Sequence, residues 1–134
     1  MIWNQSETNI WVAGHRGNPA ECPENTMASF RNAMEAGLDM IELDIQMSKD
    51  GELVIMHNLT VDQTTDGAGP IREMTLKEIR SLDAGSKFSG EYQGERVPLF
   101  EEFLELTRKY PDMTYDFELK EYPTAGNESR AYET

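Results

Sequence analysis

The stretch MIELDIQM, residues 40–47, alternates strictly between apolar and polar side chains. Successive residues of a β-strand point to opposite faces of a sheet, so this alternation predicts a strand with one apolar and one acidic face. The acidic face carries Glu42 and Asp44, whose Cα atoms lie about 6.5 Å apart in an extended strand. Two carboxylates at this spacing are close enough to share one divalent cation, so the stretch also predicts part of a metal site.

A second strand is expected at residues 53–57, because this β-prone run follows the turn signal KDGE at residues 49–52. The two strands would form a hairpin. If the turn is centred on its Asp-Gly pair, facing residues have numbers that sum to 101, and His57 stands opposite Asp44. This register would bring a side chain that can transfer protons beside the carboxylates.

A third carboxylate comes from residues 114–120, which repeat the alternation and place Glu118 on a charged face with Lys120. Together, Glu42, Asp44 and Glu118 offer oxygen ligands without a thiolate, which favours Mg²⁺, Ca²⁺ or Mn²⁺ over zinc or copper. The alternative interpretation of these acidic residues is a solvated sheet surface. Helices that cover a parallel sheet argue against that alternative, because they leave no solvated face.

Two histidines and two cationic side chains adjoin this acidic face. His15 follows the apolar residues 10–13, which predict a short strand, and His57 ends the run at 53–57. Histidine titrates near neutral pH, so one ring could donate a proton while the other accepts one. Arg16 and Lys120 suggest that an anionic group is held here. A metal, two proton carriers and two cationic groups suit the hydrolysis of a phosphate ester.

Three helices are predicted between the strands. Apolar residues at helical spacing indicate a helix over about 26–36 and another over about 100–110. A shorter helix over about 76–82 begins with a capping box formed by Thr75 and Glu78. Strands that alternate with helices predict an α/β fold with a largely parallel sheet.

Composition excludes several classes of function. The 134 residues include 25 acidic and 12 basic side chains, for a net charge of −13, which argues against binding to nucleic acid or anionic lipid. The chain has no apolar run of membrane-spanning length and no export signal at its start, so we expect a soluble, cytoplasmic protein without a membrane span. The single cysteine, Cys22, excludes an internal disulfide and a Cys/His zinc cluster, and we interpret it as a loop thiol.

Six short motifs are spaced along the chain between residues 15 and 120. They are His15-Arg16-Gly17, Pro23-Glu24-Asn25-Thr26, Glu42-Leu43-Asp44, His57-Asn58, TTDGAG at residues 64–69, and Glu118-Leu119-Lys120. Their order resembles that of the glycerophosphodiester phosphodiesterases. The segments LDAG at residues 82–85 and VP at residues 97–98 are also similar to parts of the insertion that distinguishes this family from its relatives.

The resemblance implies a TIM barrel whose active site lies at the C-terminal ends of the strands. The implied substrate is a small-molecule glycerophosphodiester, such as glycerophosphocholine or glycerophosphoethanolamine, which is hydrolysed to glycerol 3-phosphate and an alcohol. The implied ligands of the divalent cation, Mg²⁺ or Ca²⁺, are Glu42, Asp44 and Glu118. The implied general acid and base are His15 and His57, and the implied phosphate-binding residues are Arg16 and Lys120.

A TIM barrel typically needs about 250 residues. We therefore expect residues 1–134 to form a single partial domain, about the first half of a barrel, with the family insertion over about 60–97 and a loop or tail over 121–134. Half a barrel exposes strand edges, which favour association. Association of two copies, closure by shorter strands, or a missing C-terminal half would each cover these edges.

Two alternatives to this enzyme remain at the level of sequence. A phosphodiesterase of the sphingomyelinase D type shares the two histidines and the acidic triad but lacks the insertion, so residues 60–97 argue against it. A non-catalytic half-barrel module that keeps a divalent-cation site is the alternative from a different class. The family usually has His-Asp where this chain has His57-Asn58, so a neutral amide replaces a negative neighbour.

Overall fold

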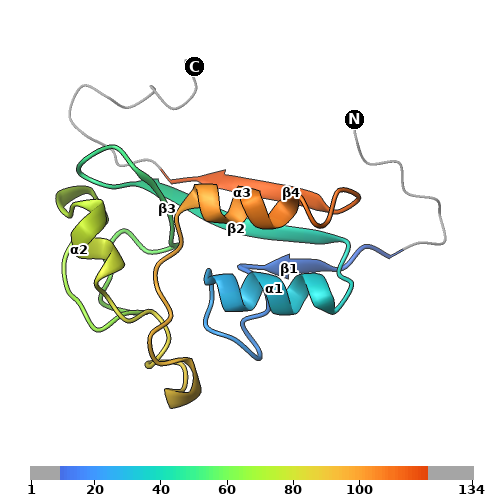
Figure 1. Cartoon of the computed structure of the whole chain (residues 1–134), viewed down its shortest axis with the longest axis horizontal. Coiled ribbons are helices and arrows are strands. Elements are labelled where there is room, and N and C mark those ends of the chain that lie inside the picture. Colours follow the sequence, from blue (N-terminus) through green and yellow to red (C-terminus); the bar gives the residue numbers. More distant parts are fainter. Residues whose placement is uncertain (1–9, 121–134) are drawn as a thin grey trace.

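A four-stranded sheet forms the centre of the molecule (Figure 1). In this computed structural model, which describes residues 10–120, the strand β2 (Met40–Met47) lies in the middle. β1 (Ala13–His15) and β4 (Thr114–Leu119) run parallel to β2 along its opposite edges. β3 (Leu53–Ile55) runs antiparallel to the last residues of β2. The predicted α/β fold with a largely parallel sheet is therefore present.

Two helices cover the apolar face of this sheet. α1 (Met27–Glu35) and α3 (Phe100–Thr107) contribute the rings of Phe30 and Phe103, whose centroids lie 4.9 Å apart and edge to face. Both rings are fully buried against the apolar residues of β2, which are Ile41, Leu43 and Ile45. Burial of the apolar face leaves the opposite, acidic face of the strands to carry the site.

Capping side chains mark the starts of α1 and α2. The side chain of Thr26 accepts a hydrogen bond from the backbone N–H of Ser29, which satisfies a free donor in the first turn of α1. The capping box of Thr75 and Glu78 is formed at the start of α2 (Leu76–Arg80). α2 ends two residues before the predicted boundary at residue 82, and α3 ends at Thr107 rather than near residue 110.

The hairpin register predicted from the sequence is wrong by one residue. Ile45 pairs with Ile55, so that facing residues sum to 100 instead of 101. The turn is a three-residue loop closed by the pair Ser48 and Glu52, in which Gly51 takes the left-handed conformation with φ +85°. The prediction assumed a two-residue turn, and the additional turn residue moves the facing position of Asp44 from His57 to Met56.

The first strand also differs from its prediction. It covers Ala13–His15 rather than residues 10–13, and Ile10 and Val12 are 90% and 51% exposed. Val12 instead pairs with Asp39, through its N–H to Oδ2 and its carbonyl to the Asp39 N–H. The shift places His15 as the last residue of the strand, directly beside the acidic face of β2.

Residues 60–97 pack against β3 and Met56 to form a second, smaller core. They contain α2 and two 3₁₀ helices, η1 (Ile71–Glu73) and η2 (Gly90–Tyr92). Arg80 joins this segment to α3 through an ion pair of 2.7 Å with Glu102. The buried side chains of this core are Val54, Met56, Val61, Ile71, Ile79, Ala84 and Val97.

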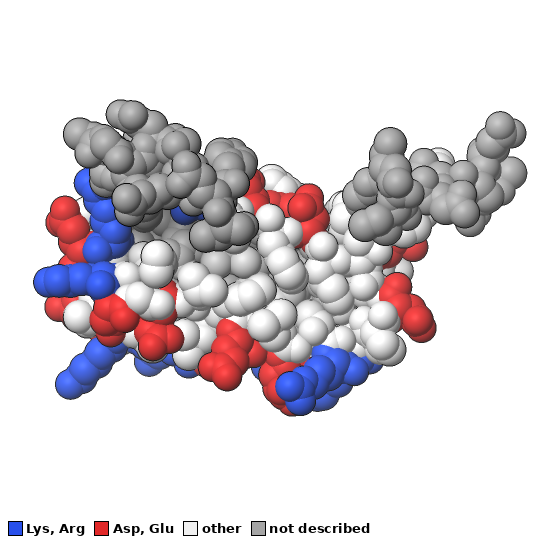
Figure 2. Space-filling model, turned by 90° about the horizontal axis from the view of Figure 1, so that it is seen from above, with Lys and Arg blue, Asp and Glu red and all other residues white. Residues whose placement is uncertain are grey.

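The surface carries both signs of charge. Figure 2 shows acidic and basic side chains interspersed at the margin of one face, around a middle of uncharged side chains. No helix within residues 10–120 has the length and apolar character that crossing a membrane requires. The loop or tail expected over 121–134 lies outside the described residues.

Candidate active site

Three carboxylates meet on the polar face of the sheet. Glu42 and Asp44 project from β2, and the parallel register places Glu118 of β4 directly beside Asp44. One oxygen from each carboxylate lies within 4.8 Å of the others. The structure therefore brings together all three residues that the sequence predicts as metal ligands.

Asp44 is the buried member of this group and accepts polar contacts from three directions. Asn25 Nδ2 donates a hydrogen bond of 2.9 Å to Oδ2, Arg16 Nε lies 3.6 Å from the same oxygen, and Lys120 Nζ lies 3.3 Å from Oδ1. Burial opposes ionisation, but the hydrogen bond from Asn25 and the close positive charge of Lys120 hold the pKa of Asp44 below its ordinary value. Asp44 thus remains an anion inside the protein.

Glu42 has the opposite electrostatic setting. Burial, together with the charges of Asp44 and Glu118, raises the pKa of Glu42 above its ordinary value. Lys120 supplies part of the compensation, since desolvation lowers its pKa but contacts with Glu118 and Asp44 outweigh this effect and raise it. The single positive charge of Lys120 does not balance the negative charge of the three carboxylates.

The donor set fits a hard divalent cation. Asp44 Oδ1 is buried and has no hydrogen-bond partner, although Lys120 lies within ion-pair distance. A buried carboxylate oxygen in this state is costly unless a cation or donor compensates it. Mg²⁺ and Ca²⁺ prefer carboxylate oxygens, so Glu42, Asp44 and Glu118 are suitable ligands for either ion.

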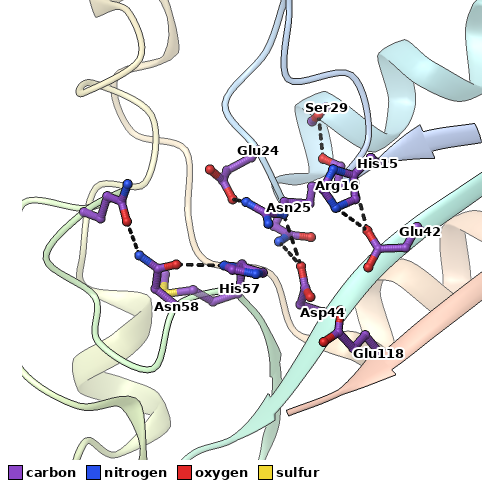
Figure 3. Close-up of polar contacts among 12 residues, drawn as sticks. His15, Arg16, Glu24, Asn25, Ser29, Glu42, Asp44, His57, Asn58 and Glu118 are labelled. Carbon is purple, nitrogen blue, oxygen red and sulfur yellow. Dashed lines mark hydrogen bonds and ion pairs between the residues drawn. The ribbon is translucent and has the colours of Figure 1, made fainter.

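The two histidines lie on either side of these carboxylates (Figure 3). His15 is paired with Glu42 in the strand register, its Nε2 lies 3.7 Å from Glu42 Oε2, and its side chain is 66% exposed. His57 follows β3, and its Nδ1 lies 2.8 Å from Asn58 Oδ1. The positive form of His57 is near enough to Asp44 to favour that carboxylate's ionised state. Although the predicted hairpin register is wrong, His57 still reaches the site.

Arg16 is held in place by an unusual local conformation. Its φ is +58°, in the left-handed region, and its carbonyl accepts hydrogen bonds from the Asn25 N–H (3.0 Å) and the Ser29 hydroxyl (3.1 Å). Gly17 follows with φ +88°, and a Cβ at this position would clash with the Ser29 side chain. The loop between β1 and α1 therefore packs against the start of α1 and turns the guanidinium toward Asp44 and Glu24.

Both predicted phosphate-binding residues are present at the site, and each contacts carboxylates. Arg16 Nη1 lies 2.9 Å from Glu24 Oε2, and Lys120 Nζ lies 2.7 Å from Glu118 Oε1. Arginine presents a planar set of donors that matches two phosphate oxygens, whereas lysine acts as a point charge. These two groups are the cations with which an anionic ligand would interact here.

Sequence reasoning missed three residues that shape the site. Glu24 and Asn25 belong to one of the six motifs but have no predicted role at the site, yet they bind Arg16 and Asp44. Gln46 is 1% exposed and donates to the carbonyls of Met56 and Asn58, on either side of His57. The signal for Gln46 was present in the alternation of residues 40–47, which places it on the same face as the carboxylates.

Cys22 is buried rather than merely placed in a loop. Its Sγ lies 3.3 Å from the hydroxyl of Tyr92, which also donates a hydrogen bond of 3.0 Å to the carbonyl of Glu21. This contact with Cys22 and the desolvation of the phenol raise the pKa of Tyr92 to about 12. The contacts join η2 to the loop that precedes α1.

Comparisons with known proteins relate this chain to one family. Residues 15–133 match the glycerophosphoryl diester phosphodiesterase family. A glycerophosphodiester phosphodiesterase of Caldanaerobacter subterraneus subsp. tengcongensis is 53% identical over 95 residues, which cover 71% of this chain and 39% of that protein. The enzyme of the same name from Bacillus subtilis is 40% identical over 113 residues, which cover 78% of this chain and 39% of the relative.

Solved structures of this family share the fold. The glycerophosphodiester phosphodiesterase of Agrobacterium tumefaciens is 40% identical with a TM-score of 0.78, and the match covers 83% of this chain and 47% of that chain. An Oleispira antarctica phosphodiesterase, solved with the product sn-glycerol-3-phosphate, is 40% identical with a TM-score of 0.80 over 88% of this chain and 47% of that chain.

The chain spans less than half the length of these relatives. Its sheet and helices match a part of their TIM barrel. Because the helices of a TIM barrel lie outside the strands, the face of β2 and β4 opposite α1 and α3 is the one that faces the interior in such a barrel. The match includes the motifs that carry the carboxylates, both histidines and both cations. The chain therefore belongs to the glycerophosphoryl diester phosphodiesterase family.

Proposed function

We propose that this chain hydrolyses glycerophosphodiesters to glycerol 3-phosphate and an alcohol in the presence of Mg²⁺ or Ca²⁺. The observation that carries the proposal is the convergence of Glu42, Asp44 and Glu118 within 4.8 Å, beside two histidines and two cationic side chains. The product found in the Oleispira antarctica relative supports the same class of substrate.

Glu42, Asp44 and Glu118 would hold the cation. A divalent cation supplies positive charge that stabilises the phosphoryl oxygens as negative charge develops on them. The buried Asp44 contributes a carboxylate that stays ionised, and the raised pKa of Glu42 marks a site where additional positive charge is favourable. Mg²⁺ and Ca²⁺ remain the two candidates because both prefer oxygen ligands.

Arg16 and Lys120 would bind the phosphodiester and orient it. The loop around Arg16 is fixed by the hydrogen bonds of its carbonyl, so the guanidinium starts from a defined backbone position. Orientation of this kind lowers the entropic cost of reaching the transition state. Exchange of the contact with Glu24 for a phosphate oxygen would keep the guanidinium donors satisfied.

His15 and His57 would move the protons. One ring takes a proton from the attacking hydroxyl, and the other gives a proton to the departing alkoxide. The nucleophile in this scheme is either water or the neighbouring hydroxyl of the glycerol group. In the second case a cyclic phosphate forms first, and the same two rings exchange roles when water opens it.

The test is hydrolysis of glycerophosphocholine by the purified chain with Mg²⁺, with Ca²⁺, and with a chelator, while light scattering reports the oligomeric state. Release of glycerol 3-phosphate that depends on the cation is the expected result. Folded protein that binds the cation but yields no product with either ion would contradict the proposal and favour a non-catalytic module. Full turnover in the chelator would contradict the role of the cation.

A further inference from the structure

The amide side chain of Asn58 lies beside His57, on the side away from the carboxylates (Figure 3). Nδ1 of His57 lies 2.8 Å from Oδ1 of Asn58. The amide nitrogen of Asn58 in turn donates to Oε1 of Gln63, which is an exposed residue of the insertion. A hydrogen-bonded series therefore runs from the insertion to the imidazole.

The direction of this series determines which ring nitrogen carries the proton. A neutral imidazole has one N–H donor and one acceptor nitrogen. Because Oδ1 of Asn58 can only accept, Nδ1 of the neutral ring must be the donor, and Nε2 then has the free lone pair. If the Asn58 amide were turned over, its NH₂ group would donate to Nδ1, and the proton would move to Nε2.

The backbone around His57 is already fixed by a different residue. Nε2 of Gln46 donates to the carbonyl of Met56 at 2.6 Å and to the carbonyl of Asn58 at 2.7 Å. Gln46 is buried, so these two bonds hold the chain on both sides of His57 against β2. These two bonds of Gln46 end on backbone carbonyls, whereas the amide nitrogen of Asn58 donates to Gln63.

We propose that Gln63 is a positioning residue for His57: by accepting from the Asn58 amide, it keeps the amide oxygen toward the ring and holds the neutral ring as the Nδ1–H tautomer. Nε2 is then the nitrogen that can accept a proton. This inference rests on the proposed function, in which His57 transfers protons. It follows from asparagine at position 58, because a carboxylate has two acceptor oxygens and needs no such orientation.

Nitrogen NMR of the imidazole rings tests the tautomer directly. The chain contains two histidines, so the variant His15→Asn assigns the His57 signals. At about pH 9, well above the ordinary titration of histidine, we expect the ¹⁵N shifts of His57 to report a protonated Nδ1 and an unprotonated Nε2. A wild-type ring protonated at Nε2 would overturn the proposal.

Variants at position 63 show whether the side chain there must accept a hydrogen bond from the Asn58 amide or can donate one to it. Gln63→Glu keeps an acceptor and should retain the Nδ1–H signals. Gln63→Lys offers only a donor to Asn58, and we expect it to turn the amide and shift His57 toward the Nε2–H tautomer. Gln93→Lys adds the same charge at another exposed position of the insertion and is the matched control. Unchanged His57 signals in a folded Gln63→Lys variant would contradict the proposal.

The substitution Asn58→Asp should restore the Nδ1–H tautomer of His57 in the Gln63→Lys variant. In that background Gln63→Lys should leave the ring in its Nδ1–H form, because either carboxylate oxygen can accept from Nδ1. In the wild-type background Gln63→Lys should also lower kcat about tenfold, as expected for a residue that orients a functional side chain. The NMR measurement needs no substrate. Absence of hydrolysis would therefore count against the proposed function alone, whereas a tautomer independent of residue 63 would count against this inference alone.

Discussion

Asn25 donates a hydrogen bond of 2.9 Å from Nδ2 to Oδ2 of Asp44, and it does so from a left-handed backbone conformation with φ +54°. Asparagine adopts this conformation more readily than most residues, and it also supplies the amide donor. The backbone N–H of Asn25 bonds to the carbonyl of Arg16, which is itself left-handed. One residue thus links a strained loop to the buried carboxylate.

Substitution of Asn25 should separate these two contributions. Asn25→Gly keeps the backbone conformation and removes a hydrogen bond to a buried charge, so we expect a loss of about 1.5–3 kcal/mol in the free energy of unfolding. Asn25→Ala should lose about 1 kcal/mol more, because Cβ disfavours the left-handed region. Urea denaturation measures both. Equal stability of the two variants would mean that the backbone conformation carries no cost.

Acid should destabilise the protein through Asp44. The pKa of this group is lower in the folded protein than its ordinary value near 3.8. Its contribution to stability is therefore present above that value and is lost as the pH falls through the lower, folded pKa. Asp44→Asn should flatten the pH dependence of the unfolding free energy in this range, whereas Asp112→Asn, at an exposed position, should leave the profile of the wild type. Identical profiles for Asp44→Asn and the wild type would show that Asp44 does not cause the loss of stability in acid.

The strand pattern of residues 40–47 was predictable because a strand repeats every two residues and one face is apolar. The same regularity, in residues 114–120, predicted the third carboxylate. The hairpin register was not predictable in this way, since it depends on whether Gly51 adds a third residue to the turn. The contact between Asn25 and Asp44 depends on two left-handed residues that no local pattern marks. The strands and helices could thus be predicted from the sequence, whereas long-range contacts of this kind could not.

Cation binding should depend on Glu42. Glu42→Gln keeps the shape of the side chain but removes a charged ligand, and we expect the affinity for Ca²⁺ or Mg²⁺ to fall about tenfold or more. Isothermal titration calorimetry near neutral pH measures the affinity. Glu52→Gln alters an exposed glutamate beside the hairpin turn and should bind the ion as the wild type does. Equal affinities of both variants would remove Glu42 from the site.

Arg16→Lys should weaken the binding of the phosphodiester. Lysine retains the charge, but it lacks the paired donors that match two phosphate oxygens and the group that contacts Glu24. We expect a higher KM for glycerophosphocholine, and Arg31→Lys on the exposed side of α1 is the control. A KM and a kcat equal to those of the wild type would exclude Arg16 from phosphate binding.

Removal of either histidine should slow turnover without unfolding the protein. His15 is largely exposed, so His15→Ala should change the unfolding free energy by no more than about 0.5 kcal/mol. If each ring transfers a proton in the same step, His15→Ala and His57→Ala should each lower kcat about 10²-fold or more. The double variant should then lose less than the product of the two single losses, since groups that act as a unit are not additive once one is missing. Steady-state kinetics of the three variants give these kcat values. A single variant with the wild-type kcat would show that its histidine does not transfer a proton in the reaction.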